Sequence, residues 1–186
     1  MYQKKFNATT HGASGKFDEQ IVYAQRNGKT TITIAKPKKE RKLTQKEQEV
    51  QDRFTEATLW GKWIMSTPEN QEPYVMAVGE KGNIYQAAIN DFLSVPMVEL
   101  VRSLNYTGVP GGQIVVLAQD DVKIDSVIVE LFNPNGDLLE SGAAQEYSKN
   151  SYRYTATTEN PAPNGTRVVV TVKDLPGNAI TKEVLL

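Results

Sequence analysis

The sequence predicts an α+β protein in which an N-terminal β-hairpin and a small helical unit precede an antiparallel β-sandwich. Three observations predict this order. The dipeptide Asn27-Gly28 separates two β-prone runs, a helical apolar period begins near residue 44, and short β-rich runs alternate with turn signals after residue 96. We therefore expect a flexible arm and hairpin over 1–42, a helical unit over 43–95 and the sandwich over 96–186.

The hairpin is predicted because Asn and Gly both tolerate the positive φ angles that a two-residue turn requires. In the resulting register, Tyr23 faces Ile32 and Ile21 faces Ile34 on one apolar face. The other face is mixed and carries the pairs Val22/Thr33 and Ala24/Thr31. A lone two-stranded hairpin is marginally stable in water, so its apolar face must dock on the following helix or on another subunit. Residues 1–20 have no apolar period, and alone they are expected to be disordered.

The helical unit is predicted to begin at a capping box formed by Thr44 and Glu47. An apolar stripe with alternating spacings of four and three residues follows, and Trp60 and Trp63 extend it sideways. The members of the stripe are Val50, Phe54, Ala57, Gly61 and Ile64. Thr67-Pro68 is expected to end this helix, because the residue before a proline avoids helical angles.

Two short helices are predicted after the first. Pro73 can open a helix that runs through Val78 and that Gly79 closes. Asn83 can cap a further helix. Its inward residues are expected to be Ile84, Ala87, Ala88 and Phe92.

After residue 96 the pattern is typical of an antiparallel sandwich. The predicted strands are 97–102, 113–119, 123–132, 137–141, 151–157, 166–172 and 179–185. Seven strands in about 90 residues are typical of an immunoglobulin-like (Ig-like) sandwich. The chain lacks the cysteine pair and the core tryptophan of antibody domains, which many other sandwiches also lack.

The C-terminal half resembles bacterial Ig-like modules. The resemblance rests on Asp120-Asp121 and on the segments SVIVELFNPNGDLLESGAA, YRYTATTENPAPNGTRVVVTVKD and PGNAITKEVLL. The sequence YAQRNGKTTI, followed by basic residues and a helix containing F-x-x-A, resembles uncharacterised bacterial proteins of the same layout. Short modules of this kind are found in surface, fibre and phage virion proteins. The resemblance implies binding or assembly and supplies no functional residues.

Few residues in the chain are suited to catalysis. Cysteine is absent, and the single histidine, His11, lies in the segment expected to be flexible. A nucleophilic triad needs a positioned imidazole, and common zinc and iron sites need several His or Cys ligands. The loop Gly108–Gly112 lacks the Lys-Ser/Thr of a phosphate-binding loop. We therefore expect no enzyme activity and no cofactor.

Calcium is the one metal for which the sequence offers a candidate set of ligands. Four aspartates could meet at one end of the sandwich, namely Asp120, Asp121, Asp125 and Asp174. Calcium needs six to eight oxygen ligands, and no EF-hand-type loop is present. The simpler interpretation of Asp120-Asp121 is a strand turn, where aspartate forms local hydrogen bonds. No metal site is therefore assigned.

Charge is divided unevenly along the chain. Residues 1–49 contain 11 Lys or Arg against 5 Asp or Glu, whereas the remainder contains 10 against 17. The basic cluster over Lys36–Lys42, with Arg26 and Lys29, has only Tyr23 as a nearby aromatic. The rest of the chain is acidic, which also argues against nucleic acid as a partner. No apolar run reaches the length of a membrane span, and the polar N-terminus does not read as a signal peptide. The sequence therefore does not determine the location of the protein, and extracellular and virion locations are both compatible with it.

These features predict a non-catalytic assembly protein, a homo-oligomer or polymer in a fibre, surface layer or virion. The N-terminal arm is expected to contact a neighbouring subunit, because its apolar face needs cover and its charge is opposite to that of the remainder. The expected contact residues are Ile21, Tyr23, Arg26, Lys29, Ile32, Ile34, Lys36, Lys38 and Lys39. The alternative is a monomeric Ig-like binding module for a glycan or a protein.

Overall fold

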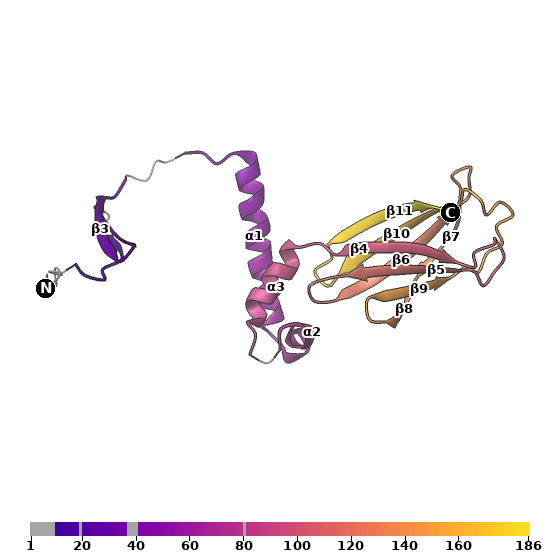
Figure 1. Ribbon diagram of the computed structural model, residues 1–186, viewed down its shortest axis with the longest axis horizontal. Coiled ribbons are helices and arrows are strands. Elements are labelled where there is room, and N and C mark those ends of the chain that lie inside the picture. Colours follow the sequence, from indigo (N-terminus) through magenta and orange to yellow (C-terminus); the bar gives the residue numbers. More distant parts are fainter. Residues whose placement is uncertain (1–9, 19, 37–40, 80) are drawn as a thin grey trace, which may run out of the picture. The chain divides into compact units, whose positions relative to one another are not determined.

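Figure 1 shows the computed structural model, which describes residues 10–18, 20–36, 41–79 and 81–186. The chain divides into two compact units, residues 1–44 and 45–186. Within the described residues, the first unit contains a three-stranded sheet, and the second contains three helices and two four-stranded sheets. All strand pairs are antiparallel, which confirms the predicted α+β class.

The N-terminal sheet contains the predicted hairpin. Strands β2 (Ile21–Arg26) and β3 (Lys29–Ile34) meet at a turn in which Asn27 and Gly28 have φ angles of 50° and 72°. The observed register confirms the predicted pairs of Tyr23 with Ile32 and of Ile21 with Ile34. A third strand, β1 (Gly15–Phe17), pairs with the other edge of β2. The sequence did not predict β1, because its three residues carry no alternation and are ordered by main-chain pairing.

The first helix, α1 (Gln45–Ile64), begins directly after the predicted cap residue and ends before Pro68. Only the C-terminal half of its apolar stripe is covered: Ala57, Gly61 and Ile64 are buried, whereas Val50 and Phe54 are 70% and 52% exposed. The N-terminal half of α1 is uncovered because α1 is longer than the helix that packs against it. A 20-residue helix is about 30 Å long, and the 10-residue α3 (Ile84–Leu93) that packs against it covers about half of that.

Helix α2 (Pro68–Val78) corrects the sequence prediction. It begins at Pro68 in the first turn and not at Pro73, which lies inside the helix. Thr67 is extended, with φ −140° and ψ 147°, and therefore acts as the N-cap residue. Pro73 removes one helical hydrogen bond, and burial of the adjacent Tyr74 in the core offsets this cost.

Helix α3 agrees with the prediction at its start, where Asn83 Oδ1 accepts a hydrogen bond from Gln86 N at 3.0 Å. Its fully buried residues are Ala88, Ile89 and Asp91, whereas Ile84, Ala87 and Phe92 are only partly covered. The buried face is therefore rotated towards Ile89 and Asp91 relative to the predicted one. Gly61 of α1 permits this close approach, since a Cβ atom there would lie 2.8 Å from the Tyr85 ring.

Eight strands follow the helices, and the seven predicted ones are among them. One sheet has the order β11-β10-β6-β7 and the other β4-β5-β9-β8. The bounds are β4 (Met97–Leu104), β5 (Gln113–Gln119), β6 (Ile124–Phe132), β7 (Leu138–Ala143), β8 (Gln145–Ser148), β9 (Ser151–Thr155), β10 (Arg167–Asp174) and β11 (Ala179–Leu185). The sequence missed β8, a four-residue strand whose side chains are all exposed.

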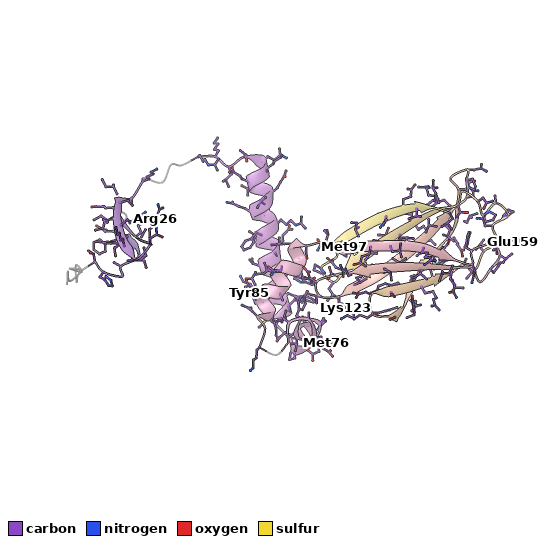
Figure 2. All side chains as sticks on the ribbon, viewed as in Figure 1. Arg26, Met76, Tyr85, Met97, Lys123 and Glu159 are labelled. Atoms are coloured by element: carbon purple, nitrogen blue, oxygen red, sulfur yellow. The ribbon has the colours of Figure 1, made fainter. Side chains whose placement is uncertain are left out.

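The two four-stranded sheets share one hydrophobic core, as in a two-layer β-sandwich. Val116 from one sheet and Val129 and Val170 from the other are fully buried within it. A smaller core joins the helices to the sandwich and includes Ile64, Tyr74 and Ala88, with Val122 packed against it. Figure 2 shows Met97 and Lys123 at the end of the sandwich next to the helices, and Glu159 at the opposite end.

Candidate functional site

The N-terminal sheet carries an apolar face that is left largely exposed by the part of its unit that the structure describes. Phe17, Ile21 and Ile34 lie in one row across the three strands, and Tyr23 and Ile32 lie in the next row. Successive side chains of a strand point to opposite faces, so these five residues share one face. Phe17, Ile32 and Ile34 are 65%, 54% and 87% exposed. We call this surface the arm face.

Two of the basic residues predicted as contacts, Arg26 and Lys29, do not share the arm face. Arg26 and Lys29 are paired next to the hairpin turn, and strand alternation places them on the opposite face with Val22 and Ala24. Lys36 follows β3 and is exposed, while Lys38 and Lys39 lie outside the described residues. The structure thus brings together the four predicted apolar residues, adds Phe17 to them and places Arg26 and Lys29 behind them.

A second apolar surface lies on the helices of the other unit. Leu59, Trp60, Trp63 and Phe92 line a shallow hollow together with Glu56. The rings of Trp60 and Trp63 are 4.8 Å apart between centroids, and those of Trp60 and Phe92 are 6.3 Å apart. Leu59 and Trp63 are exposed, so a clustered aromatic surface faces solvent within this unit.

A cluster of three carboxylates lies where α3 meets the sandwich. Asp91 comes from α3, Asp120 follows β5 and Asp174 ends β10. One oxygen from each lies within 4.8 Å of the others. Of the four aspartates that the sequence offered as possible calcium ligands, Asp120 and Asp174 belong to this cluster, whereas Asp121 and Asp125 are exposed and outside it.

Hydrogen-bond donors contact only one carboxylate oxygen of Asp91 and one of Asp120. Asp91 Oδ2 accepts a hydrogen bond from Tyr74 Oη at 2.6 Å, and that hydroxyl accepts one from Trp60 Nε1 at 2.9 Å. Asp120 Oδ2 accepts hydrogen bonds from the backbone N–H groups of Val122 and Lys123 at 3.1 and 3.2 Å. The second oxygen of each carboxylate, Oδ1, is buried without a hydrogen-bond partner.

Asp174 is held by the turn between β10 and β11. Its Oδ1 accepts hydrogen bonds from the backbone N–H groups of Gly177 and Asn178 at 2.9 and 2.6 Å. The Asn178 amide donates to Asp174 Oδ2 at 2.8 Å and to the carbonyl oxygens of Asp91 and Phe92 at 3.3 and 3.2 Å. Asn178 therefore joins the end of α3 to the sandwich beside the carboxylate cluster.

Burial dominates the electrostatics of the cluster. It raises the pKa of Asp91 to about 7, against the hydrogen bond from Tyr74. The neighbouring charges of Asp120 and Asp174 raise this pKa further, as does a side-chain hydrogen bond between the Asp91 and Asp120 carboxyl groups. Burial also raises the pKa of Asp174, although the hydrogen bonds from Asn178 and Gly177 oppose the shift. Asp91 and Asp174 are thus in places where a negative charge needs compensation.

Sequence patterns held signals for two of these residues. Asp174 continues the inward alternation of Val168, Val170 and Val172, which marks it as a core-facing carboxylate. Asp91 is the only charged residue of α3 and follows Ala87 and Ala88 on the buried side of the helix. An acidic side chain on an apolar face is informative because burial of an unpaired charge is costly.

The chain matches no protein-family model and no curated protein sequence. None of the helices in the described ranges is long and apolar enough to cross a membrane. His11, the single histidine, is exposed in a turn before β1.

Proposed function

We propose that this chain is a non-catalytic assembly subunit whose N-terminal sheet attaches to a second copy. The observation that carries the proposal is the arm face, five apolar side chains of which three are exposed and two half-buried, with no covering layer among residues 10–18 and 20–36. Fully burying one such side chain is worth about 1.5–3 kcal/mol, which gives a partner a large driving force. In this proposal, repeated contacts of this kind build a fibre, a surface layer or a virion-like shell.

A second copy is the proposed partner because the two units carry opposite charge. Residues 1–44 contain 10 Lys or Arg against 3 Asp or Glu, and residues 45–186 contain 11 against 19. The arm face also matches the apolar character of the hollow around Trp60 and Trp63. A contact between different surfaces of two copies is heterologous, and such contacts build rings or open filaments.

We further propose that the sandwich is Ig-like. Lettered in chain order as A, B, C, C′, D, E, F and G from β4 to β11, its sheets have the orders A-B-E-D and G-F-C-C′. The pairing of A, B, E and D in one sheet and of C, F and G in the other is the immunoglobulin arrangement. This strand arrangement supports the proposal that the sandwich is a rigid building block of the assembly.

The test compares two adjacent positions on β3 that face opposite ways. Ile34→Lys places a charge on the arm face, and Thr33→Lys places the same charge on the other face. Sedimentation velocity over a concentration series should show association of the parent chain and of Thr33→Lys, and at least a tenfold weaker association of Ile34→Lys. High salt should also weaken association, because exposed charge pairs are screened.

The contrary outcomes are distinct. If the parent chain sediments as a monomer at every concentration and Ile34→Lys only lowers its melting temperature, the arm face is covered within the same chain. If both lysine variants associate like the parent, the arm face is not the contact.

The second candidate is a monomeric binding module for a protein or a glycan. The end of the sandwich away from the helices favours it, because its loops are held in place. Asn160 Nδ2 donates hydrogen bonds to Thr166 Oγ1 at 2.7 Å and to Tyr106 Oη at 3.1 Å, and Asn160 N donates to Gly108 O at 2.7 Å. Ordered loops at one end of a sandwich are where such modules bind ligands.

A further inference from the structure

The carboxylates of Asp91, Asp120 and Asp174 converge although 29 and 54 residues separate them along the chain. Asp91 is 0% exposed and Asp174 is 2% exposed, whereas Asp120 is partly accessible. No Lys, Arg or His within 45–79 or 81–186 forms an ion pair with any of the three. Three acidic groups are therefore gathered without an ion pair to a basic side chain of these ranges, although Lys123 and Lys149 line the surface pocket next to Asp120.

The hydrogen bonds around the cluster leave two oxygens for a ligand. Donors occupy Asp91 Oδ2, Asp120 Oδ2 and both oxygens of Asp174. Asp91 Oδ1 and Asp120 Oδ1 are buried without a donor, and the two carboxyl groups are close enough to share a hydrogen bond only when one of them is protonated. A buried polar atom that makes no hydrogen bond costs about 1–3 kcal/mol, and more when it is charged. These orphaned oxygens, in addition to the acidic cluster itself, indicate a positive group between them.

We propose that the cluster is a binding site for a hard divalent cation, with calcium as the fitting ion. Asp91 Oδ1 and Asp120 Oδ1 are the two protein ligands without a donor. Asp174 supplies the third through Oδ2, which accepts one hydrogen bond from Asn178 and keeps a second lone pair. Calcium binds oxygens at about 2.3–2.6 Å, so two ligands of one ion lie no more than about 5 Å apart. The mutual separation of no more than 4.8 Å among the three carboxylates meets this limit.

Water can complete the coordination from the side of Asp120. Calcium takes six to eight oxygens, more than three carboxylates supply with one oxygen each. A surface pocket on this side is lined by Asp120 together with Pro73, Lys123, Lys149 and Tyr152. In this proposal the pocket is the path by which the ion and its waters enter. Magnesium demands a tighter octahedral geometry and is expected to fit less well.

The role of the ion is to join the helices to the sandwich. Asp91 belongs to α3, whereas Asp120 and Asp174 belong to the turn after β5 and the end of β10. One ion bound to all three crosslinks these elements beside the Asn178 bridge. This proposal rests on the carboxylate cluster alone and is independent of the assembly proposed above.

The experiment measures thermal unfolding of the full chain at mildly alkaline pH, after removal of metal with a chelator and again with calcium added. We expect calcium at a hundredfold excess over its Kd to raise the melting temperature by roughly 5–10 °C. Magnesium should give a smaller shift. Titration calorimetry on the metal-free chain should show saturable binding of about one calcium ion per chain.

Two matched variants locate the site. Asp91→Asn removes a ligand charge and keeps an acceptor for Tyr74, so it should fold and lose the shift caused by calcium. Asp125→Asn removes an equal charge from a nearby exposed position outside the cluster and should keep the shift.

The proposal is overturned if calcium produces neither heat nor a melting shift in the parent chain. If Asp91→Asn is then more stable than the metal-free parent, a shared proton and not a metal ion neutralises the cluster. An equal loss of the calcium shift in Asp125→Asn would also overturn the proposal, because it would indicate diffuse charge screening.

Discussion

The N-terminal sheet and the sandwich use the same strand pattern and differ in what covers it. Both are antiparallel and both have an apolar face produced by alternation. In β10, Val168, Val170 and Val172 are fully buried against the opposite sheet, whereas Ile34 on β3 is 87% exposed. An alternating pattern therefore identifies an apolar face, but it does not say which surface covers that face. In the sandwich the same chain supplies the cover, and for the arm face we propose that a second copy does.

The largest expected effect separates these two faces by their contribution to stability. Leu131 is fully buried in the sandwich core, and Leu131→Ala should lower the free energy of unfolding of the 45–186 unit by about 2–5 kcal/mol. Ile34→Ala should lower the stability of the dilute chain by less than about 0.5 kcal/mol, because the side chain is exposed. Denaturant titration at low protein concentration measures both. Equal losses would contradict the contrast between a covered and an uncovered face.

A second expected effect is specific to the sandwich and depends on pH. Burial, with Glu140 beside it, raises the pKa of Tyr154 from 10.0 to about 12. The folded state then holds this proton more tightly than the unfolded state between about pH 10 and 12, so stability falls as the pH rises through that window. The loss from this group should reach about 2 kcal/mol at pH 12.

Tyr154→Phe removes the ionisable hydroxyl and should make the alkaline decline of sandwich stability shallower. Denaturant titrations of both chains at several alkaline pH values measure the difference. An identical decline in the two chains would show that Tyr154 titrates normally in the folded protein.

The smallest expected effect is confined to the N-terminal sheet. Gly28 has φ 72° in the hairpin turn, a left-handed conformation that costs a side chain about 1–2 kcal/mol. Gly28→Ala should destabilise the β2–β3 hairpin by about 1 kcal/mol and leave the 45–186 unit unchanged. Hydrogen exchange of the amides in the two units measures the effects separately. A change in the sandwich amides would show that the two units are thermodynamically coupled.

Local chemistry predicted much of the fold. Asn27-Gly28 determined the hairpin register, and turn residues such as Pro176-Gly177 marked the sandwich strands. The elements that the sequence did not predict correctly were short or depended on tertiary contacts. Strand β1 has three residues, β8 has four, and α2 continues through Pro73 because Tyr74 is buried.

The candidate sites were predicted less completely than the fold. Four residues of the arm face follow from alternation along β2 and β3, but Phe17 depends on the pairing of β1. Asp120 and Asp174 were predicted to lie at one end of the sandwich, and they do. Asp91 is brought to them by the packing of α3, which no local pattern specifies.

The central claim is that residues 1–42 connect copies of the chain, and sedimentation velocity of the full chain against a version lacking those residues tests it most directly. Circular dichroism of the shortened chain first establishes that it is folded. The account predicts concentration-dependent particles larger than a monomer for the full chain, and a folded monomer at every concentration for the shortened one. Equal size of the two chains relative to their masses, over the whole concentration range, would contradict it and would leave the monomeric binding module as the better account.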